Sequence, residues 1–341
     1  MPRKTKRNRL TDAESIAAIN PENMRLVSDF LNYLKSTQKS ASTIEVYEND
    51  LMIAFVWCSK NNRNKTFVYW TKRDIISLQN WLINENGNSP ARVRRIKATL
   101  SSLSNYIENI CDDEYPDFRN IIHKVESPIN QPTREKTVWS DEELQALLDK
   151  LMELHQYKKA CALALAMYSG RRKSELPRFR VDDFKEDNLV CDGALYKTSA
   201  PIQTKGRGLG KFIYCYTLAK KFKPYLDAWL AERQRLGVES QWLLPDASDP
   251  DKQIQISTLD SWAITFSRLT GRDVYWHSFR HAYVTSLVRA GIPDSVITQI
   301  VGWEDSAMCK IYTDIDAEDQ IAMYFKDGEI CAGNTKSITD L

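Results

Sequence analysis

The sequence feature that most constrains the fold is a break in the helical pattern near residue 130. Residues 126–137, ESPINQPTREKT, hold two prolines and show no apolar periodicity, which is typical of an extended linker. A chain of 341 residues also exceeds what one hydrophobic core usually needs. We therefore expect two domains, joined by a linker over 127–137.

The part before this linker is predicted to be a compact helical domain over 21–126. Its apolar residues recur at helical spacing and strand signals are nearly absent. Helices are expected near 42–60, 72–86 and 89–110. Residues 1–20 are expected to form a basic flexible arm, because five of the first nine residues are Lys or Arg.

A second basic cluster lies at the start of the helix predicted over 89–110. Its members are Arg92, Arg94, Arg95 and Lys97. Successive residues on a helix cannot all face inward, so this cluster predicts a surface that contacts DNA phosphates. A solvated charged face is an equally good interpretation of each basic cluster taken alone.

The part after the linker, 138–341, shows a mixed pattern. Ser140 and Glu143 have the spacing of a capping box, and the apolar segment Ala160–Tyr168 predicts a buried helix that stops at Gly170. Turn signals and the alternating run KFIYCYTL then predict a small antiparallel sheet. Further helices are expected at Pro224–Gly237, Ser257–Leu269, 278–291, Pro293–Gly302 and around Tyr312. The fold class is therefore mainly α with a small antiparallel β-sheet.

Composition favours an ordinary soluble globular protein. Apolar residues make up 43% of the chain and charged residues 27%, and the formal net charge is only +2. The seven cysteines are scattered and never form a CxxC pair, which argues against a disulfide framework or a zinc cluster. No segment approaches the roughly 20 apolar residues of a membrane span. A cytoplasmic, nucleoid-associated location is expected, without membrane contact.

Two segments could bind an anion. In YSGRRKSEL, Arg171 and Arg172 follow the buried helix and cannot both reach solvent easily, while Glu175 is placed to hold a neighbouring group. A simple surface pair of Arg172 and Glu175 is the alternative. In WHSFRH, His277 and Arg280 open a predicted helix, whose free N–H groups favour anions.

Metal binding by the second of these segments is a weak alternative. His277 and His281 are four residues apart, but no third ligand stands at a convincing spacing. No metal and no cofactor are therefore expected. A third segment, IVGWEDSAMCKIYT, places Trp303 after Gly302 and Tyr312 nine residues further on. A tyrosine in such a setting is usually a packing residue.

In this order and spacing, the three segments together resemble the tyrosine recombinases, or phage integrase family. Family members show G-x-R-x-x-E-L, then H-x-x-R, then G-H or G-W followed by a nucleophilic tyrosine. The matching positions here are Gly170, Arg172, Glu175, Leu176, His277, Arg280, Gly302, Trp303 and Tyr312. Trp303, where histidine is more frequent, makes the resemblance Cre-like.

The resemblance implies a helical core DNA-binding domain, a mixed catalytic domain, and a phosphotyrosine mechanism without metal or ATP. It implies Tyr312 as the nucleophile, with Arg172, Arg280, His277 and Trp303 around the phosphate. It also implies a lysine from a sheet turn, for which Lys205 fits best and Lys197 and Lys211 remain alternatives. Expected partners are double-stranded DNA with inverted-repeat half-sites and three further copies of the chain, in a tetramer that passes through a Holliday junction. A bacterial, phage or plasmid origin would fit.

The tail at about 314–341 is expected to dock onto a neighbouring protomer, because its apolar residues would otherwise be exposed. Two other functions remain possible on the sequence alone. A DNA-binding protein without chemistry would be expected to lack the nucleophile or an arginine, and none is missing. A topoisomerase-like enzyme would act as a monomer, which the tail disfavours.

Overall fold

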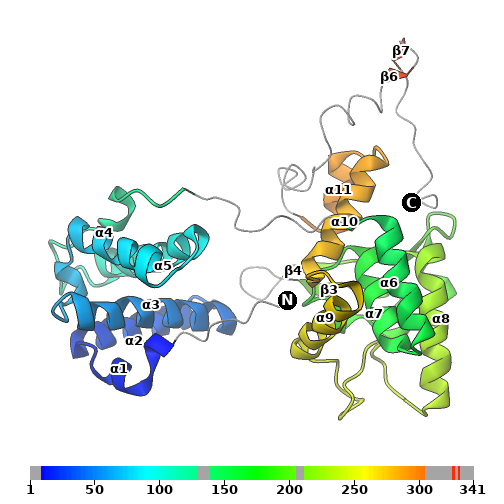
Figure 1. Ribbon diagram of the computed structural model, residues 1–341, viewed down its shortest axis with the longest axis horizontal. Helices are drawn as coiled ribbons and strands as arrows, with labels where there is room; N and C mark the ends of the chain where they lie inside the picture. The colour runs from blue at the N-terminus through cyan, green and yellow to red at the C-terminus, as the bar shows by residue number, and fades with distance from the viewer. Residues whose placement is uncertain (1–8, 130–138, 205–210, 304–324, 327–328, 331–341) are drawn as a thin grey trace. The chain divides into compact units, whose positions relative to one another are not determined.

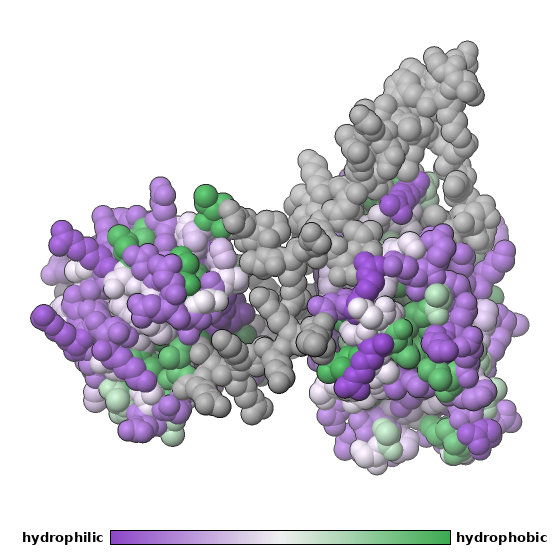
Figure 2. Space-filling view, in the orientation of Figure 1, coloured by the Kyte–Doolittle hydropathy of each residue, from purple (hydrophilic) through white to green (hydrophobic). Residues whose placement is uncertain are grey.

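The computed structural model describes residues 9–129, 139–204, 211–303, 325–326 and 329–330. These residues divide into two compact units, one before residue 130 and one from residue 139 onward, and each has its own hydrophobic core. Figure 1 shows both units with their α-helices labelled. Hydrophilic side chains cover much of the described surface in the view of Figure 2, as expected for folded units in water.

The first unit consists of helices. Its elements are η1 (Arg9–Thr11), α1 (Ala13–Ala17), α2 (Pro21–Ser36), α3 (Ala41–Asn61), η2 (Phe67–Tyr69), α4 (Lys72–Asn80), the π-helical turn η3 (Trp81–Glu85), α5 (Pro90–Ile110) and η4 (Ile122–Lys124). The core forms where α2, α3 and α5 pack together. Ser40 and Ser89 cap the starts of α3 and α5 with their side chains.

Two predictions for this unit need correction. The expected flexible arm does not extend to residue 20, because η1 and α1 occupy part of it and Asp12 caps α1 with its carboxylate. The helix expected over 72–86 changes form after Asn80. There the backbone continues as the π-helical turn η3, and Asn86 donates its N–H to the carbonyl of Trp81 five residues back.

The second unit is mainly helical with short strands. Its helices are α6 (Asp141–Glu153), α7 (Tyr157–Ser169), η5 (Leu176–Arg178), η6 (Val181–Phe184), η7 (Glu186–Asn188), α8 (Ala219–Arg235), α9 (Ile256–Thr270), α10 (Trp276–Arg289) and α11 (Asp294–Val301). The capping box of Ser140 and Glu143 is confirmed at the start of α6. Helix α7 is buried nearly all round and packs against α6, α8 and α10.

The strands form antiparallel pairs. They are β1 (Leu189–Val190), β2 (Leu195–Lys197), β3 (Ile202–Thr204), β4 (Lys211–Ile213), β5 (Tyr216–Leu218), β6 (Phe325–Lys326) and β7 (Glu329–Ile330). The sheet orders are β1-β2-β5, β3-β4 and β6-β7. The run KFIYCYTL is therefore divided between two sheets, because the strand breaks at Tyr214 and Cys215.

Helix α8 begins five residues before the predicted start at Pro224. Its first residue, Ala219, follows strand β5 directly, and Pro224 lies inside the helix. Proline lacks an N–H, but near a helix start the missing donor costs less than in the middle. The small antiparallel sheet and the helical class are confirmed by the structure.

Candidate active site

The candidate site begins where α7 ends. Gly170 adopts the left-handed conformation, with φ at 60°, which glycine accepts without steric cost. A Cβ at this position would lie 2.2 Å from Cδ1 of Tyr283 on α10. Gly170 therefore permits close packing of α7 against α10 and places the two following arginines beside their contact.

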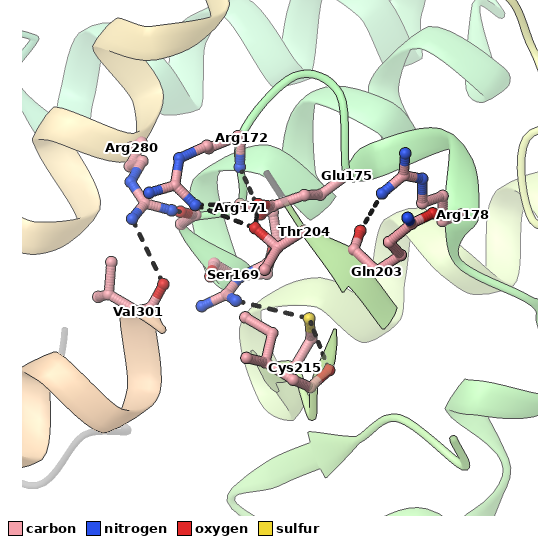
Figure 3. A network of polar contacts seen from close by, with 12 residues as sticks. Ser169, Arg171, Arg172, Glu175, Arg178, Gln203, Thr204, Cys215, Arg280 and Val301 are labelled. Carbon is pink, nitrogen blue, oxygen red and sulfur yellow. Dashed lines mark hydrogen bonds and ion pairs between the residues drawn. The ribbon is translucent and has the colours of Figure 1, made fainter. Parts of the chain in front are cut away.

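Glu175 is a fully buried carboxylate that holds Arg172. Its Oε2 accepts the backbone N–H of Arg172 at 3.0 Å, and its Oε1 accepts Nη1 of the same residue at 3.1 Å. Thr204 at the end of β3 donates its hydroxyl to Oε1 and accepts a hydrogen bond from Arg172 Nη1 at 3.1 Å (Figure 3). These three side chains form a closed set of contacts, from which the side chain of Arg172 remains 31% exposed.

The charge of Glu175 is maintained by its neighbours. Burial by itself raises the pKa of this carboxyl, but the positive charge of Arg171 and the hydrogen bond from Thr204 outweigh it. Arg172 contributes further through its backbone N–H and its guanidinium. The pKa of Glu175 is consequently lowered, and the group is an anion at neutral pH.

Arg280 lies on α10 and is fully buried. Its Nη1 donates to the carbonyl of Gly170 at 2.9 Å and its Nη2 to the carbonyl of Val301 at 3.3 Å. Its Cζ lies 5.4 Å from the ring centroid of Trp303, within cation–π range. Arg280 thus joins three separate elements of the unit.

His277 lies near the start of α10, which begins at Trp276 rather than at residue 278. Desolvation lowers the pKa of its imidazole, and the positive charges of Arg280 and Arg172 lower it further. The ring is therefore neutral at neutral pH and close to both guanidinium groups. His281 is near it, with the two ring centroids 5.8 Å apart and the rings perpendicular.

Helix α11 ends at Gly302, which again has the left-handed conformation, with φ at 73°. Trp303 follows, buried against Tyr283 and Val284 of α10. Its backbone N–H donates to the carbonyl of Thr298 at 3.0 Å. Tyr312 and Lys205 lie outside the residues that the structure describes.

The alternative lysines have distinct surroundings. Lys197 on β2 places its ammonium 4.3 Å from the ring centroid of Tyr214. Lys211 on β4 stands opposite Thr204 in the β3–β4 ladder. Lys205 follows Thr204 directly in the chain, and Thr204 contacts Arg172 and Glu175.

The basic cluster of α5 divides into two pairs. In the first pair, Arg92 and Arg95 both contact the buried carboxylate of Asp50, with Arg95 Nε at 3.2 Å. Burial raises the pKa of Asp50, against the effect of Arg95 and Thr99. The side chain of Arg95 remains 52% exposed. The carboxylate of Asp50 therefore holds the guanidinium groups of Arg92 and Arg95 in place.

The second pair contacts the segment that leads out of the unit. Lys97 is buried, and its ammonium donates to the carbonyls of Val125 and Glu126 at 2.8 and 2.9 Å. Arg94 Nη1 donates to the carbonyl of Pro128 at 3.1 Å. This geometry favours an anchoring contact for Lys97 over the phosphate contact that the sequence predicted.

Within the described ranges, no group of three or more potential metal ligands comes together. In the same residues, no helix combines the length and apolar character needed to cross a lipid bilayer.

Comparison with known proteins identifies the family. The family model described as "Phage integrase family" matches residues 138–319, more than half of the chain. The chain belongs to the phage integrase family. Its tyrosine recombinase motifs, from Gly170 to Trp303, lie inside the matched region.

Relatives in this family cover most of the chain. The recombinase-like protein YomM, derived from the SPbeta prophage of Bacillus subtilis (strain 168), is 29% identical over 278 residues, covering 79% of this chain and 80% of that protein. Tyrosine recombinase XerC of Caldanaerobacter subterraneus subsp. tengcongensis is 24% identical over 314 residues, covering 85% and 83%.

Solved structures of the family share the fold. XerH site-specific recombinase, in a post-cleavage complex with palindromic difH substrate, matches with a TM-score of 0.64 and 16% identity, covering 91% of each chain. A lambda integrase tetramer bound to a Holliday junction matches with a TM-score of 0.62 and 14% identity, covering 85% of this chain and 77% of that one.

Proposed function

We propose that this phage integrase family member is a site-specific DNA recombinase that cuts and rejoins DNA through a 3'-phosphotyrosine intermediate. The observation that carries the proposal is the convergence of Arg172, His277 and Arg280. Arg172 lies just after the end of α7, and Arg280 donates to the carbonyl of Gly170 at that end. His277 lies one turn before Arg280 on α10. A cationic set of this kind suits a phosphodiester, whose oxygens gain negative charge as the bond breaks.

In the proposed reaction, the hydroxyl oxygen of Tyr312 attacks the phosphorus and expels the 5' oxygen of the next nucleotide. Arg172 and Arg280 donate hydrogen bonds to the non-bridging oxygens. The phosphodiester is replaced by a phosphotyrosine ester of similar energy. Attack by a 5' hydroxyl on this ester therefore rejoins DNA without ATP.

Two protons have to move in each cleavage. A tyrosine hydroxyl has an unperturbed pKa of about 10, so its proton needs an acceptor, and the neutral imidazole of His277 is suited to accept it. The departing 5' oxygen needs a proton, for which we propose the ammonium of Lys205. The contact of Thr204 with Arg172 supports this choice, because Thr204 precedes Lys205 in the chain.

The surface of α5 is proposed to contact the DNA backbone through Arg92 and Arg95. Asp50 restrains both guanidinium groups, which lowers the entropy lost when they bind phosphates. The proposed assembly is a tetramer on two duplexes with inverted-repeat half-sites, in which strand exchange passes through a Holliday junction. The complexes of XerH with palindromic difH and of the lambda integrase tetramer with a Holliday junction support this assembly by analogy.

Trapping of the covalent intermediate tests the proposed function. The purified protein is incubated with nicked target DNA, which loses a short fragment on cleavage, and the adduct is digested and mapped. We expect attachment at Tyr312, no adduct with Tyr312→Phe, and DNA binding by this variant within about twofold of the unmodified protein. The matched control is Tyr214→Phe, which should form the adduct normally. Attachment at another residue would disprove the assignment.

A further inference from the structure

A second guanidinium, not part of the proposed phosphate site, is buried beside Arg172. Arg171 is fully buried. Its Nε donates to the carbonyl of Ser169 at 3.1 Å, and its Nη2 donates to the carbonyl of Ile300. Its Nη1 lies 3.5 Å from Sγ of Cys215. Figure 3 shows Arg171 beside Ser169 and Cys215. Arg171 therefore bridges the end of α7 to the last turn of α11.

Arg280 makes a parallel bridge, displaced by one residue at each end. It joins the carbonyl of Gly170 to the carbonyl of Val301, as described above. The carboxyl ends of two helices are thus connected twice, by one guanidinium each. Terminal carbonyls of a helix lack partners within the helix and carry partial negative charge, so cations stabilise them.

The two bridges differ in what the proposed reaction demands of them. Arg280 is proposed to donate to phosphate oxygens, and two of the five N–H groups of its guanidinium are engaged with carbonyls in the structure. Arg171 is enclosed by protein and contacts carbonyls and a sulfur. The hydrogen bonds of Arg171 therefore do not compete with binding of the phosphate.

Packing alone does not account for a charge at position 171. A buried guanidinium carries a large desolvation cost, and an apolar side chain of similar volume is often at least as stabilising. The hydrogen bonds of Arg171 cross from one helix end to another, 129 residues apart in the chain. The guanidinium of Arg171 therefore connects α7 to α11 through hydrogen bonds, which an apolar side chain of the same volume could not do.

We propose that Arg171 is a positioning residue that holds the last turn of α11 on the end of α7 while Arg280 binds the phosphate. The inference rests on the proposed function. Its consequence is that Gly302 and Trp303 keep their place during catalysis, so that the chain leading to Tyr312 starts from a fixed point. Without Arg171, the end of α11 would be held only by Arg280, the guanidinium that is also proposed to bind the phosphate.

The first experiment compares Arg171→Met with the unmodified protein in single-turnover cleavage of nicked target DNA. We expect the rate constant for adduct formation to fall about tenfold or more, with DNA affinity within about twofold. A rate constant does not depend on the fraction of folded protein, so a simple loss of stability leaves it unchanged.

The matched control is Arg233→Met. Arg233 on α8 is also buried, and it also donates to backbone carbonyls, those of Ser240, Trp242 and Leu243. Its hydrogen bonds join α8 to residues 240–243 and involve neither α7 nor α11. This variant should lose stability to a similar extent, yet cleave at the rate of the unmodified protein.

The second experiment separates positioning from phosphate activation. Both proteins are prepared with Tyr312→Phe, and hydrogen peroxide is supplied as a small external nucleophile that attacks the activated phosphodiester. Because peroxide reaches the phosphorus without the protein chain, its rate should fall several-fold less than the tyrosine-dependent rate when Arg171 is replaced by Met. An equal fall in both reactions would overturn the proposal, since Arg171 would then act on the phosphate.

The remaining outcomes are also decisive. Tyrosine-dependent cleavage by Arg171→Met at the unmodified rate overturns the positioning role, even if adducts form normally at Tyr312. Failure of the unmodified protein to form any adduct refutes the proposed function instead. If Arg171→Met does not fold, Arg171→Lys replaces it, because one ammonium cannot span both carbonyls. It should cleave several-fold more slowly, and an unmodified rate would again overturn the proposal.

Discussion

Thr204 and Glu175, 29 residues apart in the chain, are joined by a hydrogen bond from the threonine hydroxyl to the buried carboxylate. The same hydroxyl accepts a hydrogen bond from Arg172. The end of β3 is therefore attached to the arginine that is proposed to bind the phosphate. Arg172, Glu175 and Thr204 depend on one another for their positions.

Substitution of Thr204 by Val tests this dependence, because valine has nearly the same shape but no hydroxyl. Glu175 would lose a donor while remaining buried, so we expect the free energy of unfolding to fall by about 1–3 kcal/mol. Strand cleavage should slow about tenfold as Arg172 loses its restraint. Denaturant unfolding and single-turnover cleavage measure the two effects. Thr204→Ser keeps the hydroxyl and should retain most of both properties.

The lowered pKa of His277 predicts uptake of a proton when DNA binds. In the free protein, desolvation, Arg280 and Arg172 disfavour the imidazolium form. A phosphate placed between these groups adds negative charge and raises the pKa of His277 back toward its ordinary value of about 6.5, so that the ring is still neutral above that pH. Calorimetric binding titrations near pH 6, in buffers that differ in ionisation enthalpy, should show this uptake.

The variant His277→Gln should lose the proton uptake, whereas His155→Gln, in the turn between α6 and α7, should keep it. The same pKa also sets a stability trend for the free protein. Below pH 6.5 the unfolded chain binds a proton at this histidine before the folded chain does, so stability falls as the pH drops through that window. Proton uptake that persists in His277→Gln would contradict the prediction.

Gly170→Ala is predicted to disrupt the site through the packing of α7 against α10. The left-handed backbone costs alanine about 1 kcal/mol or more, and the added Cβ would collide with the buried ring of Tyr283. We expect a loss of several kcal/mol in the free energy of unfolding and loss of cleavage. Gly237→Ala is the control, since that glycine has a similar φ of 64° but open space around its Cα. Equal destabilisation by both changes would show that backbone strain, and not the contact of α7 with α10, is responsible.

Assignment of the general acid rests on substrates in which sulfur replaces the bridging 5' oxygen. A thiolate leaves readily without a proton, so loss of the acid no longer matters. Lys205→Ala should slow cleavage of ordinary DNA by about 100-fold or more and should cleave the sulfur substrate almost normally. Arg172→Ala should not be rescued. Rescue in Lys197→Ala or Lys211→Ala instead would move the role to that lysine.

Local patterns were sufficient to predict the ends of several elements. The Ser140 and Glu143 capping box and the helix stop at Gly170 depend on residues close in sequence, and both are present as predicted. The adjacent arginines also indicated that one of them would be buried, which Arg171 is. Local chemistry determines these features, so the sequence displays them directly.

Contacts between distant segments were not predictable in the same way. Nothing near Thr204 indicates that its hydroxyl meets Glu175, and nothing near Arg171 indicates the carbonyl of Ile300. Lys97 resembles its basic neighbours, but tertiary packing turns it inward. The roles of Tyr312, Lys205 and the tail remain predictions, since Tyr312, Lys205 and most of the tail lie outside the described ranges.

Helix α5 carries two sets of contacts on one rigid element, so the two sets move together. Arg92 and Arg95 are proposed to contact DNA, whereas Arg94 and Lys97 bind carbonyls of residues 125–128, the segment that leads out of the unit. A shift of α5 on a duplex would therefore displace residues 125–128 as well, and a shift of those residues would displace the proposed DNA contacts.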